Sequence, residues 1–231
     1  MNFLQNIDLG LIAVQFAVLL FSLSIHEAAH AWMADRRGDY TARYMGRVTL
    51  NPVAHIDPIG TVLFPLIGFF SQLPLIGWAK PVPVNPLHLK DPVQDQMYIS
   101  FAGPAANLIA SVCAFILLLL SKHLVPGAWN STIYWIAPEY FAGNPSLITP
   151  VMGILFYLMV INLILAFFNL IPIPPLDGHW ILSGFLSPSA AESFQRFGSY
   201  GIIVLWGLMI LGIFRIFMIP IGWLLRLLDA W

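Results

Sequence analysis

The run from Leu9 to Ala34 is almost wholly apolar and long enough to cross a lipid bilayer as one helix. A spanning helix needs about 20 mostly apolar residues. Three ionisable side chains nevertheless lie inside this run: His26, Glu27 and His30. Ionisable groups at membrane depth are costly, and they usually mark a functional site. Any fold of this chain must therefore enclose these three side chains in protein.

Composition places most of the remaining chain in the same environment. Of the 231 residues, 59% are hydrophobic and 9% are charged, whereas about 25% are charged in a typical soluble domain. A soluble protein of this length could not cover so much apolar surface. The net charge of −1 comes with no basic tract, which argues against a nucleic-acid partner. The single cysteine, Cys113, excludes an intrachain disulfide.

The spacing of the apolar segments predicts an all-α polytopic membrane protein with about five to six transmembrane segments. We expect one domain over residues 1–231, with a re-entrant or β-hairpin-like element between the first and second core helices. Gly38 suits the end of the first helix. The core helices are expected at about 9–34, 97–120 and 150–171, and the re-entrant or gating region at about 46–92. The C-terminal helices are expected at about 198–228, where the chain could form one span or a pair with a break near Pro220.

The positions of the basic residues predict how the chain is oriented across the membrane. They gather in two connections, Arg36, Arg37, Arg43 and Arg47 in the first and Lys80 and Lys90 in the next. The positive-inside rule places both connections in the cytoplasm and the N-terminus outside, with His26 and His30 towards the cytoplasmic side. Segment 59–78 must then enter and leave on one side, which favours a re-entrant hairpin. Residues 80–96 are Pro-rich and should be extended, and residues 121–150 should form a loop.

The polar residues of the first helix form the pattern HExxH. Positions i and i+4 share one face of a helix, so the imidazoles of His26 and His30 can reach one ion. Glu27 projects to the neighbouring side, where it can take a proton from an activated water molecule. Imidazole ligands make zinc the expected metal. The residue counts give HExxH a chance expectation of roughly 0.002 in this chain; the alternative is a structural polar cluster.

A catalytic zinc site holds three protein ligands, so a third must come from another segment. The best candidate is Asp177, in the sequence NLIPIPPLDGHW at 169–180. The prolines of this sequence forbid a regular helix, and Asp177-Gly178 reads as a turn. Two alternatives remain open. Asp177 could be solvated at the interface, and the neighbouring His179 could be the ligand instead, although we expect it to be a bystander.

These motifs together resemble the site-2 protease family of intramembrane zinc metalloproteases. HEAAH at 26–30 matches the first signature of the family, and NLIPIPPLDG at 169–178 matches the second. FAGPAAN at 101–107 and GRVTLNPVAHIDPIGT at 46–61 are similar to further elements of the small bacterial branch. Larger relatives carry a PDZ or a CBS domain, and the connection at 121–150 is too short for such a module.

The resemblance implies a zinc-dependent endopeptidase that cleaves transmembrane segments of substrate proteins within the bilayer. His26, His30 and Asp177 would hold one zinc ion, and Glu27 would be the general base. Asn169 would bind the substrate backbone or stabilise the oxyanion, with a helix-capping role as the alternative. The competing function is a metal-binding membrane protein without catalysis: a zinc transporter, a sensor or an inactive relative.

The remaining polar residues receive structural interpretations. Asn107 and the pair Gly103-Pro104 should serve close packing and polar contact between core helices. His55 and Asp57 could shape the substrate path, but a solvated loop is the preferred reading. His88 and His123 have interfacial positions with no partner visible in the sequence.

Overall fold

The computed structural model describes residues 9–71, 77–137, 140–141, 144–212, 215–216 and 218–230. Within these ranges every regular element is helical, and no strand occurs. Three helices have the length and composition to cross a membrane: α1 (Leu9–Arg37), α4 (Pro92–Leu124) and α6 (Thr149–Asn169). The all-α membrane fold is therefore confirmed. The described residues contain fewer span-length helices than the five to six segments expected.

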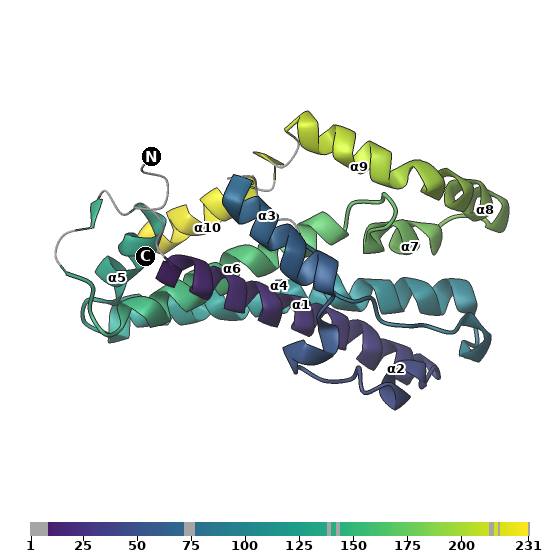
Figure 1. Cartoon of the computed structure of the whole chain (residues 1–231), viewed down its shortest axis with the longest axis horizontal. Coiled ribbons are helices and arrows are strands. Elements are labelled where there is room, and N and C mark those ends of the chain that lie inside the picture. The colour runs from purple at the N-terminus through teal and green to yellow at the C-terminus, as the bar shows by residue number, and fades with distance from the viewer. Residues whose placement is uncertain are drawn as a thin grey trace.

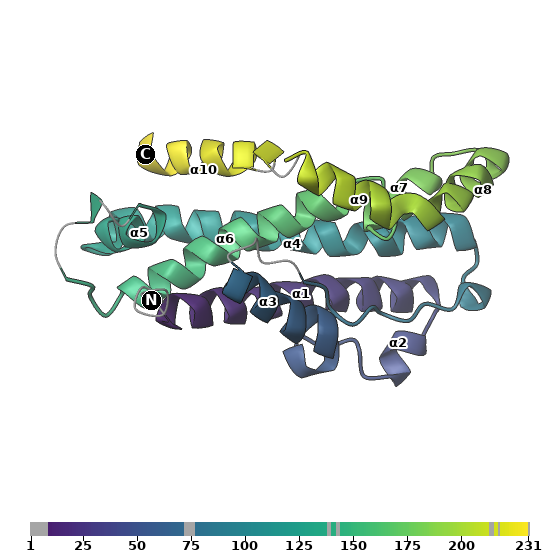
Figure 2. The same cartoon turned by 45° about the horizontal axis from the view of Figure 1, so that its top comes forward.

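The three long helices pack against one another as the centre of the fold (Figure 1). An apolar cluster between α4 and α6 includes Ala114, Leu118, Phe156 and Met159. In Figure 2 the C-terminal helices α8, α9 and α10 lie on one side of α4 and α6, while α1 and α3 lie on the other. Lipid-facing side chains on α1, α4 and α6 remain exposed, as expected for helices solvated by lipid.

Two helix ends follow from local sequence signals. At the end of α1, Gly38 has a φ of +102°, a conformation that strongly favours glycine and closes the helix as expected. Helix α4 begins at Pro92, five residues earlier than the expected Met97, because Asp91 caps it and accepts a hydrogen bond from the backbone N–H of Gln94. Proline at the first helical position loses no intrahelical bond there.

The chain between α1 and α4 consists of short elements and an extended segment. The short elements are α2 (Thr41–Tyr44), the 3₁₀ helices η2 (Pro52–His55) and η4 (Pro86–His88), the π-helix η3 (Pro58–Leu63) and α3 (Phe64–Ser71). Residues 72–76 lie outside the described part. The extended segment, residues 77–85, is called the strap below.

The two ends of segment 59–78 lie next to each other. The backbone N–H of Trp78 donates to the carbonyl oxygen of Gly60 at 3.2 Å, and the hydroxyl of Thr61 donates to the carbonyl oxygen of Trp78 at 2.8 Å. The described residues of this range are helical at its start, through η3 and α3, and contain no strand. The β-hairpin-like form is therefore not observed in them.

The connection after α4 is not simply a loop. Helix α5 (Ala128–Ile136) forms there and packs on α6, with the indole N–H of Trp135 donating to the carbonyl oxygen of Thr149 at 2.6 Å. Gly127, with a φ of +80°, makes the sharp turn between α4 and α5. The expectation of a loop over 121–150 was wrong here because aromatic burial against α6 stabilises a helix that few local signals announce.

The C-terminal part contains α7 (Asp177–Ser183), α8 (Pro188–Phe197), η6 (Gly198–Tyr200), α9 (Gly201–Ile210) and α10 (Met218–Ala230). The expected break near Pro220 comes earlier, between α9 and α10, where Gly212 has a φ of +75°. Pro220 instead lies in the first turn of α10, where backbone N–H groups have no intrahelical partner and proline causes no loss. Neither α9 nor α10 alone reaches span length.

Candidate metal centre

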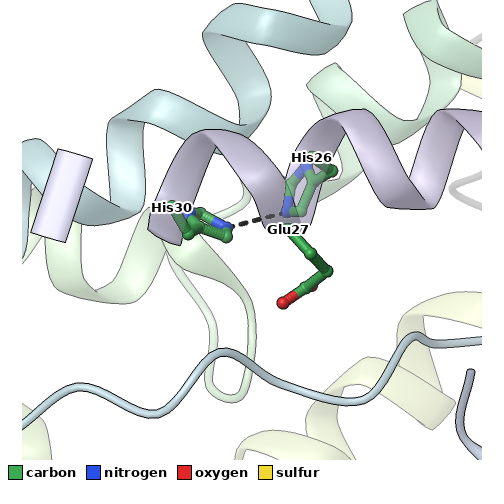
Figure 3. A group of neighbouring side chains, drawn as sticks. All are labelled: His26, Glu27 and His30. Carbon is green, nitrogen blue, oxygen red and sulfur yellow. Dashed lines mark hydrogen bonds between the residues drawn. The ribbon is translucent and has the colours of Figure 1, made fainter. Parts of the chain in front are cut away.

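The two histidines of HExxH meet on one face of α1. Their rings are one helical turn apart, with centroids separated by 4.5 Å, and the Nε2 atoms of His26 and His30 are 3.0 Å apart (Figure 3). The side chain of Glu27 extends beside the two rings, and one ligand atom from each of the three residues lies within 4.8 Å of the others. All three side chains are buried.

Asp177 reaches this pair from a distant part of the sequence. Its Oδ2 lies 3.0 Å from Nε2 of His26, and its Oδ1 lies 3.4 Å from Nε2 of His30. The expected turn at Asp177-Gly178 is instead the start of α7, which packs on α4. Glycine is needed at 178 because a Cβ there would collide with the carbonyl oxygens of Leu170 and Ile171. The close approach brings Asp177 to the imidazoles.

Contacts on the far side of each imidazole fix its orientation. Nδ1 of His30 donates to the carbonyl oxygen of Ile99 at 2.7 Å, and Nδ1 of His26 lies 2.5 Å from Oδ1 of Asn107. Both partners are on α4. Gly103, also on α4, lets the rings lie against that helix, since a Cβ would come within 2.5 Å of His30 Nε2 and 2.7 Å of His26 Cε1. Asn107 and Gly103 thus contact the site as well as packing helices together.

The donor set fits a divalent metal ion. Ligands about 2.05 Å from a tetrahedral zinc ion would be about 3.3 Å apart, and the three separations here are 3.0, 3.0 and 3.4 Å. Because His30 uses Nδ1–H to bond a carbonyl oxygen, its neutral ring directs a lone pair from Nε2 towards the other donors. Asp177 Oδ2 is buried, and none of the described residues gives it a hydrogen bond. Such convergent lone pairs repel unless a cation lies between them.

Glu27 contacts the strap. The backbone N–H of Val82 donates to Oε2 of Glu27 at 3.0 Å. Pro81 and Pro83 flank Val82, and they hold this part of the strap extended because proline fixes φ and restricts the preceding residue. Val84 packs against an apolar cluster that includes Ala34 of α1. The strap therefore runs along the last turns of α1 and supplies one hydrogen-bond donor to the glutamate.

Polar contacts hold both ends of the strap. At one end, Lys80 donates its N–H to the carbonyl oxygen of His55 at 2.9 Å and accepts from the Arg47 guanidinium. At the other, the N–H of Asn85 donates to Oδ2 of Asp39 at 2.7 Å. His88 also contacts Asp39, with Nδ1 2.9 Å from Oδ1. The strap is thus fixed to the chain around it.

Two sequence interpretations are corrected by these contacts. His55 is buried, with Nε2 2.8 Å from the carbonyl oxygen of Thr49, and does not lie in a solvated loop. Asp57 caps η3 by accepting from the N–H groups of Ile59 and Gly60. His88 has a partner in Asp39. A sequence read locally does not reveal these contacts because they join segments that tertiary folding brings together.

The two buried charges that hold the strap have shifted pKa values. Burial raises the pKa of the Asp39 carboxyl, but hydrogen bonds from Thr41, Asn85 and His88 outweigh it and leave that pKa below its usual value. Burial lowers the pKa of the Arg47 guanidinium, while attraction to Glu27 opposes that shift. Asp39 is therefore ionised at neutral pH, and it carries four hydrogen bonds as an acceptor.

Two other candidates lie apart from the convergent donors. The Asn169 amide donates to the carbonyl oxygen of Leu165 at 2.9 Å, and no hydrogen bond among the described residues joins it to the histidines or Asp177. The His179 ring stacks on Phe194 of α8, with centroids 4.9 Å apart. His179 thus packs between α7 and α8.

The chain was compared with known proteins. The model of peptidase family M50 matches residues 14–212. The chain belongs to this family. Its resemblance to site-2 proteases is thereby confirmed, and this M50 protein is a zinc-dependent membrane metalloprotease.

Relatives of this M50 protein carry matching names. "Putative zinc metalloprotease YwhC" of Bacillus subtilis is 36% identical over 196 residues, which are 85% of this chain and 80% of the relative. "Putative zinc metalloprotease Rip2" of Mycolicibacterium smegmatis is 29% identical over 203 residues, 87% of this chain and 68% of the relative. "Putative zinc metalloprotease MJ0611" of Methanocaldococcus jannaschii is 38% identical over 84 residues, 36% of this chain and 31% of the relative. No solved structure matches the chain significantly.

Proposed function

We propose that this M50 protein is an intramembrane endopeptidase that hydrolyses peptide bonds in or near transmembrane segments of other proteins. The observation that carries the proposal is the convergence of His26 Nε2, His30 Nε2 and the Asp177 carboxylate, with Glu27 beside them. In this assignment the first three residues hold one zinc ion, and Glu27 is the general base.

Each residue of the site has its own role in the proposed hydrolysis. When bound, zinc would activate a water molecule and polarise the scissile carbonyl. Glu27 accepts the proton of the attacking water and passes it to the leaving nitrogen, a role that typically contributes 10²- to 10⁴-fold in rate. The N–H of Val82 holds the Glu27 carboxylate in place beside the histidines. Asn169 binds the substrate backbone or the developing oxyanion with its amide N–H.

Substrate access is assigned to the region between α1 and α4. A peptide bond in a substrate helix is shielded by its own hydrogen bonds, so the substrate must unwind before cleavage. Segment 59–78 and the strap line or gate the entry, and 59–78 re-enters the membrane from the cytoplasmic side. The return of Trp78 to Gly60 supports this topology. The N-terminus lies outside a bacterial inner membrane, with the site towards the cytoplasm.

A non-catalytic metal-binding function is the alternative. A zinc transporter needs a chain of ligands along a path. His55 instead contacts Thr49, and His88 contacts Asp39, so neither continues a path from the site. An inactive relative would have no use for a buried glutamate beside the donors. Both observations favour the protease.

The test is cleavage of a model single-span protein by the purified enzyme in lipid vesicles, with zinc content measured in parallel. Glu27→Gln should keep one zinc ion per chain and lose at least about 100-fold in cleavage rate, because only the base is removed. His26→Ala and Asp177→Ala should lose zinc itself. Removing zinc with a chelator should abolish wild-type cleavage, and adding zinc back should restore it. Unchanged cleavage by Glu27→Gln would refute the proposal.

A further inference from the structure

A buried amide on α6 is connected to the candidate metal centre through a second amide on α4. Asn162 lies in the middle of an apolar helix and is fully buried. An amide in this environment is costly unless its polar atoms are bonded. Asn162 meets that condition: Nδ2 donates to the carbonyl oxygen of Leu158 and to the hydroxyl of Ser22, both at 2.8 Å, and Oδ1 accepts from Nδ2 of Asn107 at 2.7 Å.

The direction of each amide is fixed by a carbonyl oxygen that can only accept. Because the Leu158 carbonyl needs a donor, the Asn162 nitrogen must face it, and Oδ1 of Asn162 must face Asn107. Likewise the carbonyl oxygen of Ser22, 3.1 Å away, requires the nitrogen of Asn107. The remaining atom of Asn107, Oδ1, is then directed at Nδ1 of His26, 2.5 Å away.

We propose that Asn162 is a positioning residue that sets the tautomer of His26 through Asn107. Facing an oxygen, Nδ1 of His26 must carry the proton, and Nε2 then presents its lone pair to His30 and Asp177. The inference rests on the proposed metal site. Helix α6 contributes none of the three metal-binding donors, but through Asn162 it controls one of them, Nε2 of His26.

Asn162 is needed as well as Asn107 to set the tautomer. The Asn107 amide alone would fit its space in either orientation, with its oxygen and nitrogen exchanged. With Asn162 removed, the 3.1 Å bond to the Ser22 carbonyl is the one hydrogen bond from the described residues that still holds the nitrogen of Asn107. A flipped amide would direct N–H groups at His26 Nδ1 and stabilise the tautomer with the proton on Nε2, which has no lone pair on Nε2 for a metal held with His30 and Asp177. Loss of such outer partners typically weakens metal binding by about 10- to 100-fold.

The chain offers a matched control one turn along α4. Ser111 is also buried, and its hydroxyl donates to the carbonyl oxygen of Met159 on α6 at 2.8 Å. The bond joins the same two helices but does not lead to His26. Ser111→Ala should therefore reproduce the loss of a helix–helix hydrogen bond and leave the metal site intact.

The experiment measures zinc affinity of the full-length protein in detergent by competition with a chromogenic chelator. Asn162→Leu and Asn107→Leu should weaken zinc binding by about 10- to 100-fold, while Ser111→Ala should bind as wild type does. Equal affinity of Asn162→Leu and wild type would overturn the proposal, and so would equal weakening by Ser111→Ala. If the wild type bound no zinc, the metal site itself would fail, which is a different outcome.

A second measurement reports the tautomer in the wild type itself. Nitrogen NMR of ¹⁵N-histidine-labelled, zinc-free wild type, with His26 assigned by comparison with His26→Gln, reports which ring nitrogen carries the proton in the neutral form. The proposal requires the proton on Nδ1. A proton on Nε2 in the folded protein would overturn it. In Asn162→Leu the signal should shift towards a mixture of both forms, while Ser111→Ala should keep the wild-type spectrum.

Discussion

The backbone N–H of Val82 donates a hydrogen bond to Oε2 of Glu27, 55 residues away in the sequence, at 3.0 Å. The bond joins the proposed general base to a strap that is itself fixed at Lys80 and Asn85. Since a backbone donor cannot rotate away as a side chain can, the glutamate has a fixed partner.

Val82→Pro should lower kcat by about tenfold and leave KM and zinc content unchanged. Proline removes only the N–H that Glu27 uses, and the extended backbone between Pro81 and Pro83 suits it. Loss of one hydrogen bond to a charged group costs about 1.5 kcal/mol, which corresponds to about tenfold in rate. The measurement is steady-state cleavage of the model span. Val82→Ala keeps the N–H and serves as the control; equal activity of the proline and alanine variants would contradict the prediction.

Asp39→Asn should loosen the strap and destabilise the protein by about 1–3 kcal/mol, because an amide cannot accept all four hydrogen bonds that the carboxylate accepts. Hydrogen exchange at Asn85, together with chemical unfolding in detergent, measures the effect. Asp91→Asn is the control, since asparagine caps a helix as well as aspartate does. If both variants were equally stable, the contacts of Asp39 would contribute nothing to stability.

Asp39 should also make the stability of the folded protein depend on pH. The pKa of Asp39 in the folded protein is below its ordinary value of 3.8, so its contribution to stability is fully present above that pH and is lost as the pH falls through the folded pKa. Unfolding measured from pH 6 downwards should show a smaller acid-induced loss in Asp39→Asn than in wild type. An unchanged acid dependence would contradict the assignment.

Gly103→Ala should weaken zinc binding by at least about tenfold, because the added Cβ would collide with both imidazoles. Chelator competition measures it. Gly222→Ala in α10 is the matched control, since nothing lies within 4 Å of its added Cβ. That variant should bind zinc normally and gain up to about 1 kcal/mol of stability from helix propensity. Normal zinc binding by Gly103→Ala would show that the rings can move aside.

Asn169→Asp should reduce kcat by about 10²- to 10³-fold with zinc content unchanged, because it keeps the shape of the side chain and removes the donor proposed for the substrate or oxyanion. Asn169→Ala should lose a similar factor. If the residue only caps α6 through the Leu165 carbonyl, both variants would keep nearly full kcat and lose only about 0.5–1.5 kcal/mol of stability. The ratio of kcat values therefore separates the two roles.

Local sequence was sufficient to predict the three long helices and to nominate the residues of the candidate site. Apolar length predicts α1, α4 and α6, and helical spacing alone places His26 and His30 on one face. Asp177 was chosen because a two-histidine site lacks a ligand. The start of α4 at Pro92 was missed although the signal, an aspartate cap followed by proline, is printed in the sequence.

The partners of the site could not be read in the same way. Asn107 was interpreted as a packing residue, and Asn162 drew no attention, although an amide in an apolar helix is the signal that could have found it. Likewise nothing local links Val82 to Glu27 or Asp39 to His88. The amide contacts depend on which faces of α1, α4 and α6 meet, and the other two depend on the path of the chain between α1 and α4.

The sequence by itself determined a membrane protein with an imidazole pair on a spanning helix, because length, apolarity and a four-residue spacing are properties of a single segment. Only the tertiary structure decided how the Asp177 carboxylate and the amides of Asn107 and Asn162 are arranged behind and beside that pair, and that a backbone N–H contacts Glu27. Hydrogen bonds of 2.5 to 3.1 Å between helices require a specific packing of three helices, and the bond from Val82 to Glu27 requires the strap to lie along α1. That arrangement is set by the whole chain rather than by any stretch of it.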